Sequence, residues 1–248
     1  MNLKIKSDIH VCIVSWEGTH DNASFIANQL SSINDHVSII YSDPNPEYSP
    51  KVSCRLIKRP NELFWSDKFK ACLNASECEH LLVIHADCKY LNWLDLVYKY
   101  DEAIQKISNL GIWTPEVNFT PYGLDITSIY TINNTQYEIV CFIDALVFGF
   151  SKAIQSRMDL INYQNNKFGW GIDRIMACYA LSINKLLIMD KSIQVEHPKG
   201  RGYSALEAKE EMVEFLMQLT FSERIYARLI QSYVTSNIQK KSKEQDLG

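Results

Sequence analysis

The sequence predicts an α/β protein with a mixed, mainly parallel β-sheet flanked by helices. Through the first ninety residues, apolar runs of strand length alternate with segments of helical periodicity, which is typical of a parallel sheet with crossover helices. Residues 81–84 are apolar at every position, as in a strand buried on both faces. Polar side chains follow directly after several of these strands, where open α/β sheets bind their ligands.

The composition supports one sizeable domain. The chain has 248 residues, 46% hydrophobic and 22% charged, with a formal net charge of −4. Proteins that bind nucleic acids usually carry a basic face, whereas this chain has a net negative charge, so no nucleic-acid partner is expected. Seven cysteines without a CxxC pair indicate reduced, mostly buried thiols. With no apolar run of membrane-spanning length and no signal peptide recognised, we expect a cytoplasmic protein.

The elements of the first half follow from local patterns. Residues 9–15 predict the first strand, and helical spacing of apolar residues begins at Asn22, with Asp21 or Asn22 as its cap. Residues 36–41 predict a second strand that ends at Asp43 and Pro44, and residues 52–57 a third. A helix over residues 62–76 then leads into the apolar strand at residue 81.

The second half is less regular. We expect a helix over residues 92–110, a short strand over 111–115 and a helix over 152–159. Residues 122–147 are rich in Thr, Ile, Tyr and Val, which predicts strand or long loop. Residues 168–173 form a glycine-punctuated turn that opens a helix to Ala180, and residues 186–195 predict the last strand.

Two amphipathic helices are predicted over residues 204–239, separated by a capping box from Thr220 to Glu223. We divide the chain into a domain of residues 1–203, a helical extension of residues 204–239 and a polar, disordered tail of residues 240–248. The apolar side chains of the first of these helices predict packing on the domain or a homodimer face, and less often a peripheral membrane contact.

His85 and Asp87 follow the apolar strand and are separated by Ala86. In extended backbone such residues point to the same side. A hard divalent cation needs little more than one or two such side chains and the phosphates of a substrate. The pair therefore predicts a metal site, although Asp87 as a strand-end cap and His85 as a hydrogen-bonded core residue remain alternatives.

The order of these features resembles the GT-A fold glycosyltransferases, in particular bacterial family 2-like sugar transferases. The resemblance covers about residues 9–203 and rests on four parts of the sequence. The first is the end of the first strand at Ser15 and Trp16, together with the acidic Asp43 after the second strand. The other three are Ile84-His85-Ala86-Asp87-Cys88, Gly169-Trp170-Gly171-Ile172-Asp173 and Val195-Glu196-His197. His85 stands where the family has the first carboxylate of its DxD motif, and Lys70 where it commonly has Asn.

The resemblance implies a role for each candidate residue. Asp173 would be the catalytic base, and Asp144 and Trp170 would contact the acceptor. Asp87, His197 and His85 would hold Mn²⁺ or Mg²⁺, of which Mn²⁺ suits the imidazoles better. The residues implied in donor binding are Ser15, Trp16, Asp43, Lys70, His85, Asp87, Lys199 and Arg201. From the residues alone, Asp173 can also be a helix cap, Asp43 a turn residue, Asp144 a partner of the backbone and Trp170 a packing residue.

The resemblance implies a metal-assisted, inverting transfer of a hexosyl group from a nucleotide sugar to a hydroxyl of a glycan or lipid-linked glycan precursor. The setting would be bacterial polysaccharide biosynthesis in the cytoplasm, at the inner face of the membrane. A catalytically silent scaffold that binds a sugar or a partner remains an alternative, supported by His85. A sugar nucleotidyltransferase is disfavoured, because the loop of residues 16–20 has one Gly and neither Lys nor Arg.

Overall fold

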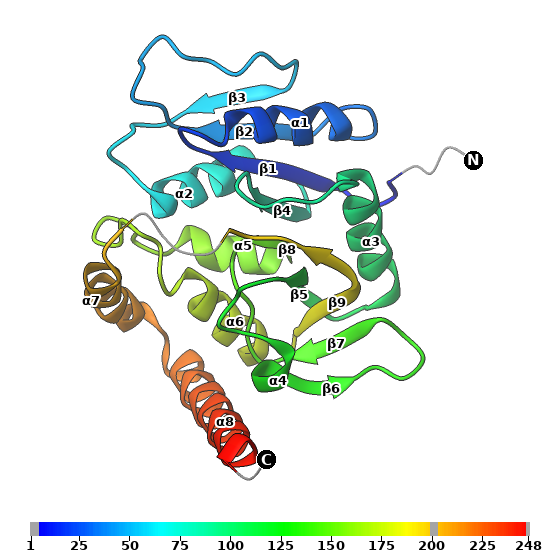
Figure 1. Ribbon diagram of the computed structural model, residues 1–248, viewed down its shortest axis with the longest axis vertical. Coiled ribbons are helices and arrows are strands. Elements are labelled where there is room, and N and C mark those ends of the chain that lie inside the picture. Colours follow the sequence, from blue (N-terminus) through cyan, green and yellow to red (C-terminus); the bar gives the residue numbers. More distant parts are fainter. Residues whose placement is uncertain (1–4, 199–202, 247–248) are drawn as a thin grey trace.

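The computed structural model describes residues 5–198 and 203–246. In this part of the chain, nine strands form one sheet in the order β3-β2-β1-β4-β8-β5-β9-β7-β6 (Figure 1). The strands are β1 (Ile9–Ser15), β2 (Val37–Tyr41), β3 (Arg55–Lys58), β4 (His80–His85), β5 (Leu110–Val117), β6 (Ser128–Thr131), β7 (Tyr137–Val140), β8 (Val147–Ser151) and β9 (Leu186–Val195). The helices are α1 (His20–Leu30), α2 (Trp65–Ala75), α3 (Trp93–Lys106), α4 (Leu124–Thr127), α5 (Lys152–Asp159), α6 (Ile172–Ser182), α7 (Ala205–Phe215) and α8 (Phe221–Asp246), with a 3₁₀ turn η1 (Leu216–Gln218).

The sheet has a parallel half and a mixed half. Strands β3, β2, β1 and β4 run parallel, so their carboxyl ends lie at one edge. Strand β8 pairs antiparallel with both β4 and β5, while β5 and β9 are parallel to each other. The hairpin of β6 and β7 closes the far side. The predicted mixed, mainly parallel sheet is confirmed.

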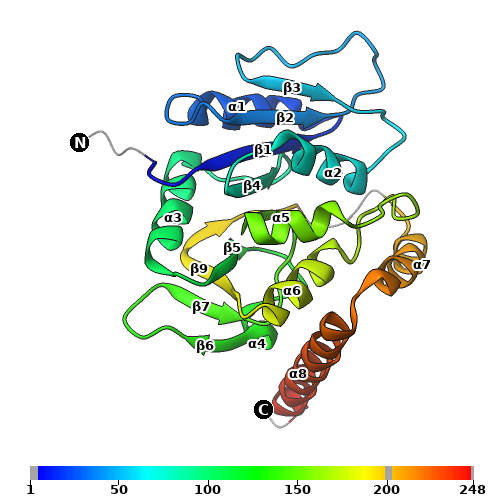
Figure 2. The same ribbon diagram turned by 180° about the vertical axis from the view of Figure 1, so that it is seen from behind.

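Both faces of the central strands are buried. On β4, Leu82 and Ile84 face the core that contains α1 and α3, whereas Leu81 and Val83 face the core that contains α2, α5 and α6. Figures 1 and 2 show these helices on the two sides of the sheet. This alternation explains the unbroken apolar run, because successive side chains of a strand point to opposite faces.

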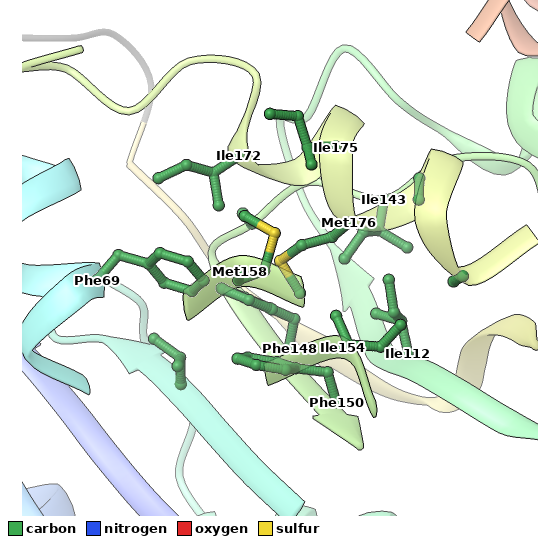
Figure 3. Packing of buried hydrophobic residues seen from close by; sticks show 14 of the residues in the cluster. Phe69, Ile112, Ile143, Phe148, Phe150, Ile154, Met158, Ile172, Ile175 and Met176 are labelled. Atoms are coloured by element: carbon green, nitrogen blue, oxygen red, sulfur yellow. The ribbon is translucent and has the colours of Figure 1, made fainter. Parts of the chain in front are cut away.

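Aromatic and methionine side chains fill the core between the sheet and α2, α5 and α6 (Figure 3). The rings of Phe148 and Phe150 on β8 stack at 5.5 Å, and Phe69 of α2 lies 6.2 Å from Phe148. Met158 of α5 and Met176 of α6 are fully buried beside them. Such flexible thioethers fill irregular gaps between rings. The packing fixes α5 on β8 and α6 on α5, β5 and β9, and α6 carries Asp173 at its amino end.

Several element boundaries were predicted correctly, and others were wrong. The predicted ranges 9–15, 152–159 and 186–195 coincide with β1, α5 and β9. Helix α1 begins at His20 and not at Asn22, because Thr19 already closes a turn onto Trp16 through its backbone and its hydroxyl. Residues 122–147 contain the short helix α4 as well as β6 and β7.

Helix α8 lies against α6 and α4 (Figures 1 and 2). The capping box is confirmed: the backbone N–H of Thr220 donates to Glu223 at 2.6 Å, and the N–H of Glu223 donates to the Thr220 hydroxyl at 3.4 Å. Helix α8 continues to Asp246, so the prediction of a disordered tail from residue 240 was wrong. Within the described ranges, we find no helix with the length and apolar character needed to cross a membrane.

A buried ion pair joins α5 to the start of α8. The guanidinium of Arg157 donates to both carboxylate oxygens of Glu223, at 2.6 and 2.9 Å, and to the carbonyl of Gln218 at 2.9 Å. The Glu223 side chain is fully buried. Burial would raise the pKa of Glu223, but its bonds from Arg157 and Thr220 lower it below the usual value.

We predict that Glu223→Ala lowers the free energy of unfolding by about 3–5 kcal/mol, because it leaves the Arg157 charge desolvated and unpaired. Urea denaturation measures this change. Glu210→Ala, which removes an exposed carboxylate of α7, is the matched control and should cost less than about 0.5 kcal/mol. Equal losses in the two variants would contradict the role given to the ion pair.

Candidate active site

The carboxyl edge of the parallel half gathers most of the predicted site residues. Ser15 ends β1, Asp43 follows β2, and His85 ends β4. The amino end of α6 brings Asp173, and the chain after β9 brings His197. Because carboxyl ends of parallel strands meet at one edge, residues distant in sequence are adjacent here.

A tight turn after β4 presents Asp87. The backbone N–H of Cys88 donates to the carbonyl of His85 at 3.1 Å, which closes the turn. The side-chain amide of Asn22 donates to the carbonyls of Ala86 and Cys88, both at 2.8 Å. With the carbonyls on either side of it held by α1, the backbone of Asp87 is fixed.

A short antiparallel bridge brings the chain after β9 against this turn. Lys89 and Glu196 exchange two backbone hydrogen bonds, at 2.8 and 3.0 Å. The next residue is His197, and its Nε2 lies 3.4 Å from Oδ2 of Asp87. Burial acts to raise the pKa of Asp87, but the bond from His197 and the charges of His85 and His197 lower it. Asp87 is therefore ionised at neutral pH.

His85 lies deeper, between two tryptophans. Its ring centroid is 4.3 Å from that of Trp65 and 5.7 Å from that of Trp16, both in edge-on contacts. Burial lowers the pKa of His85 to about 4, so its imidazole is neutral at pH 7. The ligand atoms of His85, Asp87 and His197 do not all approach within 4.8 Å of one another in the described structure.

The residues of this edge fit a divalent cation. Among the described residues, neither Oδ1 of Asp87 nor Nε2 of His85 has a hydrogen-bond partner, although both atoms are buried. Buried polar atoms without partners are rare and call for a ligand or water. A carboxylate with neighbouring imidazoles offers oxygen and nitrogen donors to a divalent cation such as Mn²⁺. Asp87 and His197, which are in contact, are the pair best placed to hold it.

A braced loop carries Asp173. The buried Asn166 accepts from the N–H of Gly169 at 2.9 Å and donates to the carbonyl of Trp170 at 3.0 Å. Gly169 has a φ of +75°, and a β-carbon there would lie 2.3 Å from a ring atom of Trp65. Only glycine allows both this backbone and this close approach to α2. The loop thereby positions the first turn of α6.

Asp173 and Asp144 interact as like charges. Burial and the Asp144 carboxylate raise the pKa of Asp173 to about 7, against hydrogen bonds from the backbone at the helix start. Burial also raises the pKa of Asp144, whose Oδ2 accepts from the hydroxyl of Thr120 at 2.8 Å. The charge of His197 acts on Asp144 in the opposite direction. Asp144 thus links the Asp87–His197 pair electrostatically to Asp173.

A second polar chain lies at the ends of β1 and β2. The Ser15 hydroxyl is 2.7 Å from Nδ1 of His20, and Nε2 of His20 is 3.0 Å from Oδ2 of Asp43. The ring of Tyr48 stacks on His20 at 4.6 Å. Ser15 and Asp43 are therefore held together through His20. Sequence reasoning missed His20, because a histidine in the first turn of a helix carries no local signal of such a contact.

Trp170, in the loop before α6, is hydrogen-bonded to another aromatic residue. The indole N–H of Trp170 donates to the hydroxyl of Tyr203 at 2.9 Å. The ring of Tyr203 in turn stacks on Phe168 at 4.7 Å. The aromatic rings of Phe168, Trp170 and Tyr203 therefore lie together between the start of α7 and the loop that carries Asp173.

Lys70, which was expected to bind the donor, does not lie at the site, whereas Lys68 does lie near it. Lys70 points away from the site, because its ammonium donates to the carbonyl and carboxylate of Asp159 at 3.1 and 3.0 Å. Its place among the donor-binding residues is not supported by this geometry. Instead, the buried Lys68 lies near His85; its ammonium donates to the carbonyl of Leu63 at 2.8 Å, and burial lowers its pKa to about 8. Lys199 and Arg201 lie outside the described residues.

Three further residues were missed by sequence reasoning. Asn22 was interpreted only as a helix cap, although its side chain fixes the Asp87 turn. Tyr122 lies in the segment expected to be strand or loop, and Thr120 lies just before it. Burial, together with the carboxylates of Asp173 and Asp144, raises the pKa of Tyr122 to about 12. A local pattern does not reveal such contacts.

No protein-family model matches the chain, and no curated protein sequence matches it significantly. Several solved structures do. GalNAc-T7 with UDP, GalNAc and Mn²⁺ matches with a TM-score of 0.60 at 11% identity, over 86% of this chain and 48% of that one. This chain thus spans about half the length of GalNAc-T7.

Two other structures are covered more fully. The mannosyltransferase PcManGT of Pyrobaculum calidifontis with GDP-Man and Mn²⁺ matches with a TM-score of 0.56 at 10% identity, over 94% and 70% of the two chains. Glucosyl-3-phosphoglycerate synthase of Mycobacterium tuberculosis with Mg²⁺ and UDP has a TM-score of 0.56 at 9% identity, over 86% and 79%. At such identities the likeness shows the fold, which is the GT-A fold; a family 2-like membership stays a prediction.

We predict that Gly169→Ala lowers the free energy of unfolding by about 1–3 kcal/mol more than Gly18→Ala does, because the added methyl group meets Trp65. Gly18 is the matched control: its φ of +86° imposes the same backbone strain, but nothing lies within 4 Å of its β-carbon position. Thermal or urea unfolding of both variants measures the difference. Equal destabilisation would show that Trp65 moves aside without cost.

Proposed function

We propose that this protein is a glycosyltransferase that takes a sugar from a nucleotide-sugar donor with the help of a divalent cation. The observation that carries the proposal is the bridge between Lys89 and Glu196, which sets His197 against Asp87 at the carboxyl edge of the sheet. A GT-A fold and an ionised carboxylate beside an imidazole at this edge support a donor diphosphate as the ligand. A cation bound by Asp87 and His197 would stabilise the charge that develops on the leaving diphosphate.

Asp173 is the proposed general base. In a single displacement, the acceptor hydroxyl oxygen bonds to the anomeric carbon, and the bond from that carbon to the phosphate oxygen breaks with its electron pair on the diphosphate. The hydroxyl proton passes to the Asp173 carboxylate. A base is most effective when its pKa lies near the working pH, and Asp144 and burial bring Asp173 to about 7. Such a displacement inverts the anomeric centre.

Binding groups for the donor and acceptor are proposed from the same geometry. Ser15, Asp43 and the ring of Trp16 line the ends of β1 and β2, where the nucleoside of the donor would lie. Trp170 would offer an indole face to an acceptor sugar near Asp173, and a hydroxyl beside Asp144 would approach the base. A glycan or lipid-linked glycan precursor fits this acceptor. Cytoplasmic location, membrane contact and a homodimer stay predictions.

We predict that one of UDP, GDP, CMP and dTDP raises the thermal unfolding midpoint in the presence of Mn²⁺, and that EDTA abolishes the shift. A ligand that binds only the folded state stabilises it in proportion to the logarithm of its concentration over Kd. Asp87→Ala should abolish the metal-dependent shift. Asp35→Ala, which removes an exposed carboxylate from the loop before β2, is the control and should retain it.

Each other outcome changes the proposal in a defined way. A nucleotide shift that survives EDTA would keep the donor site and remove the cation from it. If no nucleotide shifts the unfolding midpoint, the proposal that the protein is a glycosyltransferase is contradicted. That outcome would favour the catalytically silent scaffold, the alternative that His85 in the place of a carboxylate supports.

We predict that Asp173→Asn lowers the rate of sugar transfer by about 10²- to 10⁴-fold and leaves the nucleotide-induced thermal shift unchanged, because the amide cannot accept the proton. Release of nucleotide from the donor identified above measures the rate. In the unsubstituted enzyme kcat/KM should fall as the pH drops below about 7, since Asp173 is then protonated. Asp144→Asn should move this acid limb to lower pH, because it removes the like charge that raises the pKa of Asp173.

The same Asp35 substitution, made here as Asp35→Asn, is the control and should leave the pH profile unchanged. Loss of both transfer and nucleotide binding in Asp173→Asn would contradict the assignment of the base.

A further inference from the structure

Three potential metal ligands meet at the edge of the sheet opposite the candidate active site. Asp8 precedes β1, His36 precedes β2, and Cys78 precedes β4, so each lies at the amino end of a parallel strand (Figure 1). One ligand atom from each lies within 4.8 Å of the other two. These residues are far apart in the chain, and only the pairing of β2, β1 and β4 brings them together.

The backbone of each of the three residues is held by a hydrogen bond to another element. The carbonyl of Asp8 accepts from the N–H of His80 at 3.0 Å, and that of His36 accepts from Val11 at 2.8 Å. The carbonyl of Cys78 accepts from the buried side-chain amide of Gln155 at 3.2 Å. The ligands therefore project from fixed strand ends, as a preorganised metal site requires.

The side chains are also oriented. A carboxylate oxygen of Asp8 accepts from the N–H of Glu79 at 3.0 Å, which turns the carboxylate toward the segment that carries Cys78. Cys78 is buried, whereas Asp8 and His36 are exposed. The site thus has a thiol at its base and an open side through which an ion can enter.

We propose that Asp8, His36 and Cys78 form a binding site for Zn²⁺, separate from the candidate active site. Zinc is bound in proteins by thiolate, imidazole and carboxylate together, and three protein ligands leave one position for water. On binding, the Cys78 thiol releases its proton to solvent, and its sulfur bonds to the ion. Ligand atoms of a tetrahedral zinc site lie about 3.5 Å apart, and rotation of the two exposed side chains closes the remaining gap.

The consequence of zinc binding here is structural. The ion would tie the amino ends of three adjacent strands, and it would do so only in the folded state, because the ligands are far apart in the unfolded chain. The site also differs chemically from the edge that carries Asp87. Asp87, His85 and His197 offer oxygen and nitrogen, whereas the proposed zinc site adds sulfur. The proposal is independent of the proposed function.

The test titrates the reduced, metal-free full chain with Co²⁺ and follows its absorption, because cobalt bound to a thiolate shows a sulfur-to-metal charge-transfer band. We expect the band to reach its maximum at one equivalent of Co²⁺ and to disappear when Zn²⁺ displaces the cobalt. We also expect Zn²⁺ to raise the thermal unfolding midpoint. Cys78→Ser should abolish the band. Cys54→Ser is the matched control, since Cys54 is also a free thiol, half-buried just before β3, and it should retain the band.

His36→Gln keeps the proposal testable if Cys78→Ser does not fold, because His36 is exposed. It should weaken cobalt binding at least about tenfold. Asp87→Asn should leave the band unchanged, which separates this site from the candidate active site. A band that persists in Cys78→Ser, or the absence of a band in the unsubstituted protein, would overturn the proposal.

Discussion

The contact between the turn after β4 and the end of β9 is the constraint on which the candidate active site depends. Lys89 and Glu196 are bonded there through their backbones, in both directions. Asn22 holds the other side of the turn from α1. Because backbone groups must find partners when they are buried, this bridge fixes Asp87 and His197 more firmly than a contact between two flexible side chains would. The Asp87–His197 pair exists only because the sheet places these two segments side by side.

The electrostatic environment separates the acidic groups of the site into two kinds. The pKa of Asp87 is lowered in spite of its burial, because imidazoles lie beside it. Burial raises the pKa values of both Asp144 and Asp173, and the Asp144 carboxylate raises that of Asp173 further. Titratable groups whose environments push their pKa values apart are suited to different roles. An ionised Asp87 suits a cation, and an Asp173 near neutrality suits proton transfer.

The two edges of the parallel half have different chemistry. Ser15 and His85 end β1 and β4, and Asp43 follows β2, whereas Asp8, His36 and Cys78 precede the same three strands. Parallel pairing places all starts at one edge and all ends at the other, so one topology creates two separate clusters. The oxygen- and nitrogen-rich edge is proposed to bind a nucleotide sugar, and the edge with sulfur is proposed to bind zinc.

Local pattern was enough for much of the fold. The strands β1 and β9 and the helix α5 coincide with the predicted ranges, because apolar periodicity and capping act within one element. The local sequence pattern also placed Asp87 after the end of a strand and Asp173 at the start of a helix. The partners of these residues came only from the tertiary structure. Asn22 reaches a turn on another element, and Thr120 reaches Asp144 across a loop.

The orientation of Lys70 was likewise decided by packing. Helical spacing alone did not show that its ammonium meets Asp159 on α5 and not the site. The sequence by itself therefore determined the order of strands and helices in the first half of the chain and the residue types at their ends, whereas α4, β6 and β7 came only from the structure. Which of those residues meet was decided by pairing and packing between distant segments, because contact energies depend on neighbours that a local window does not contain.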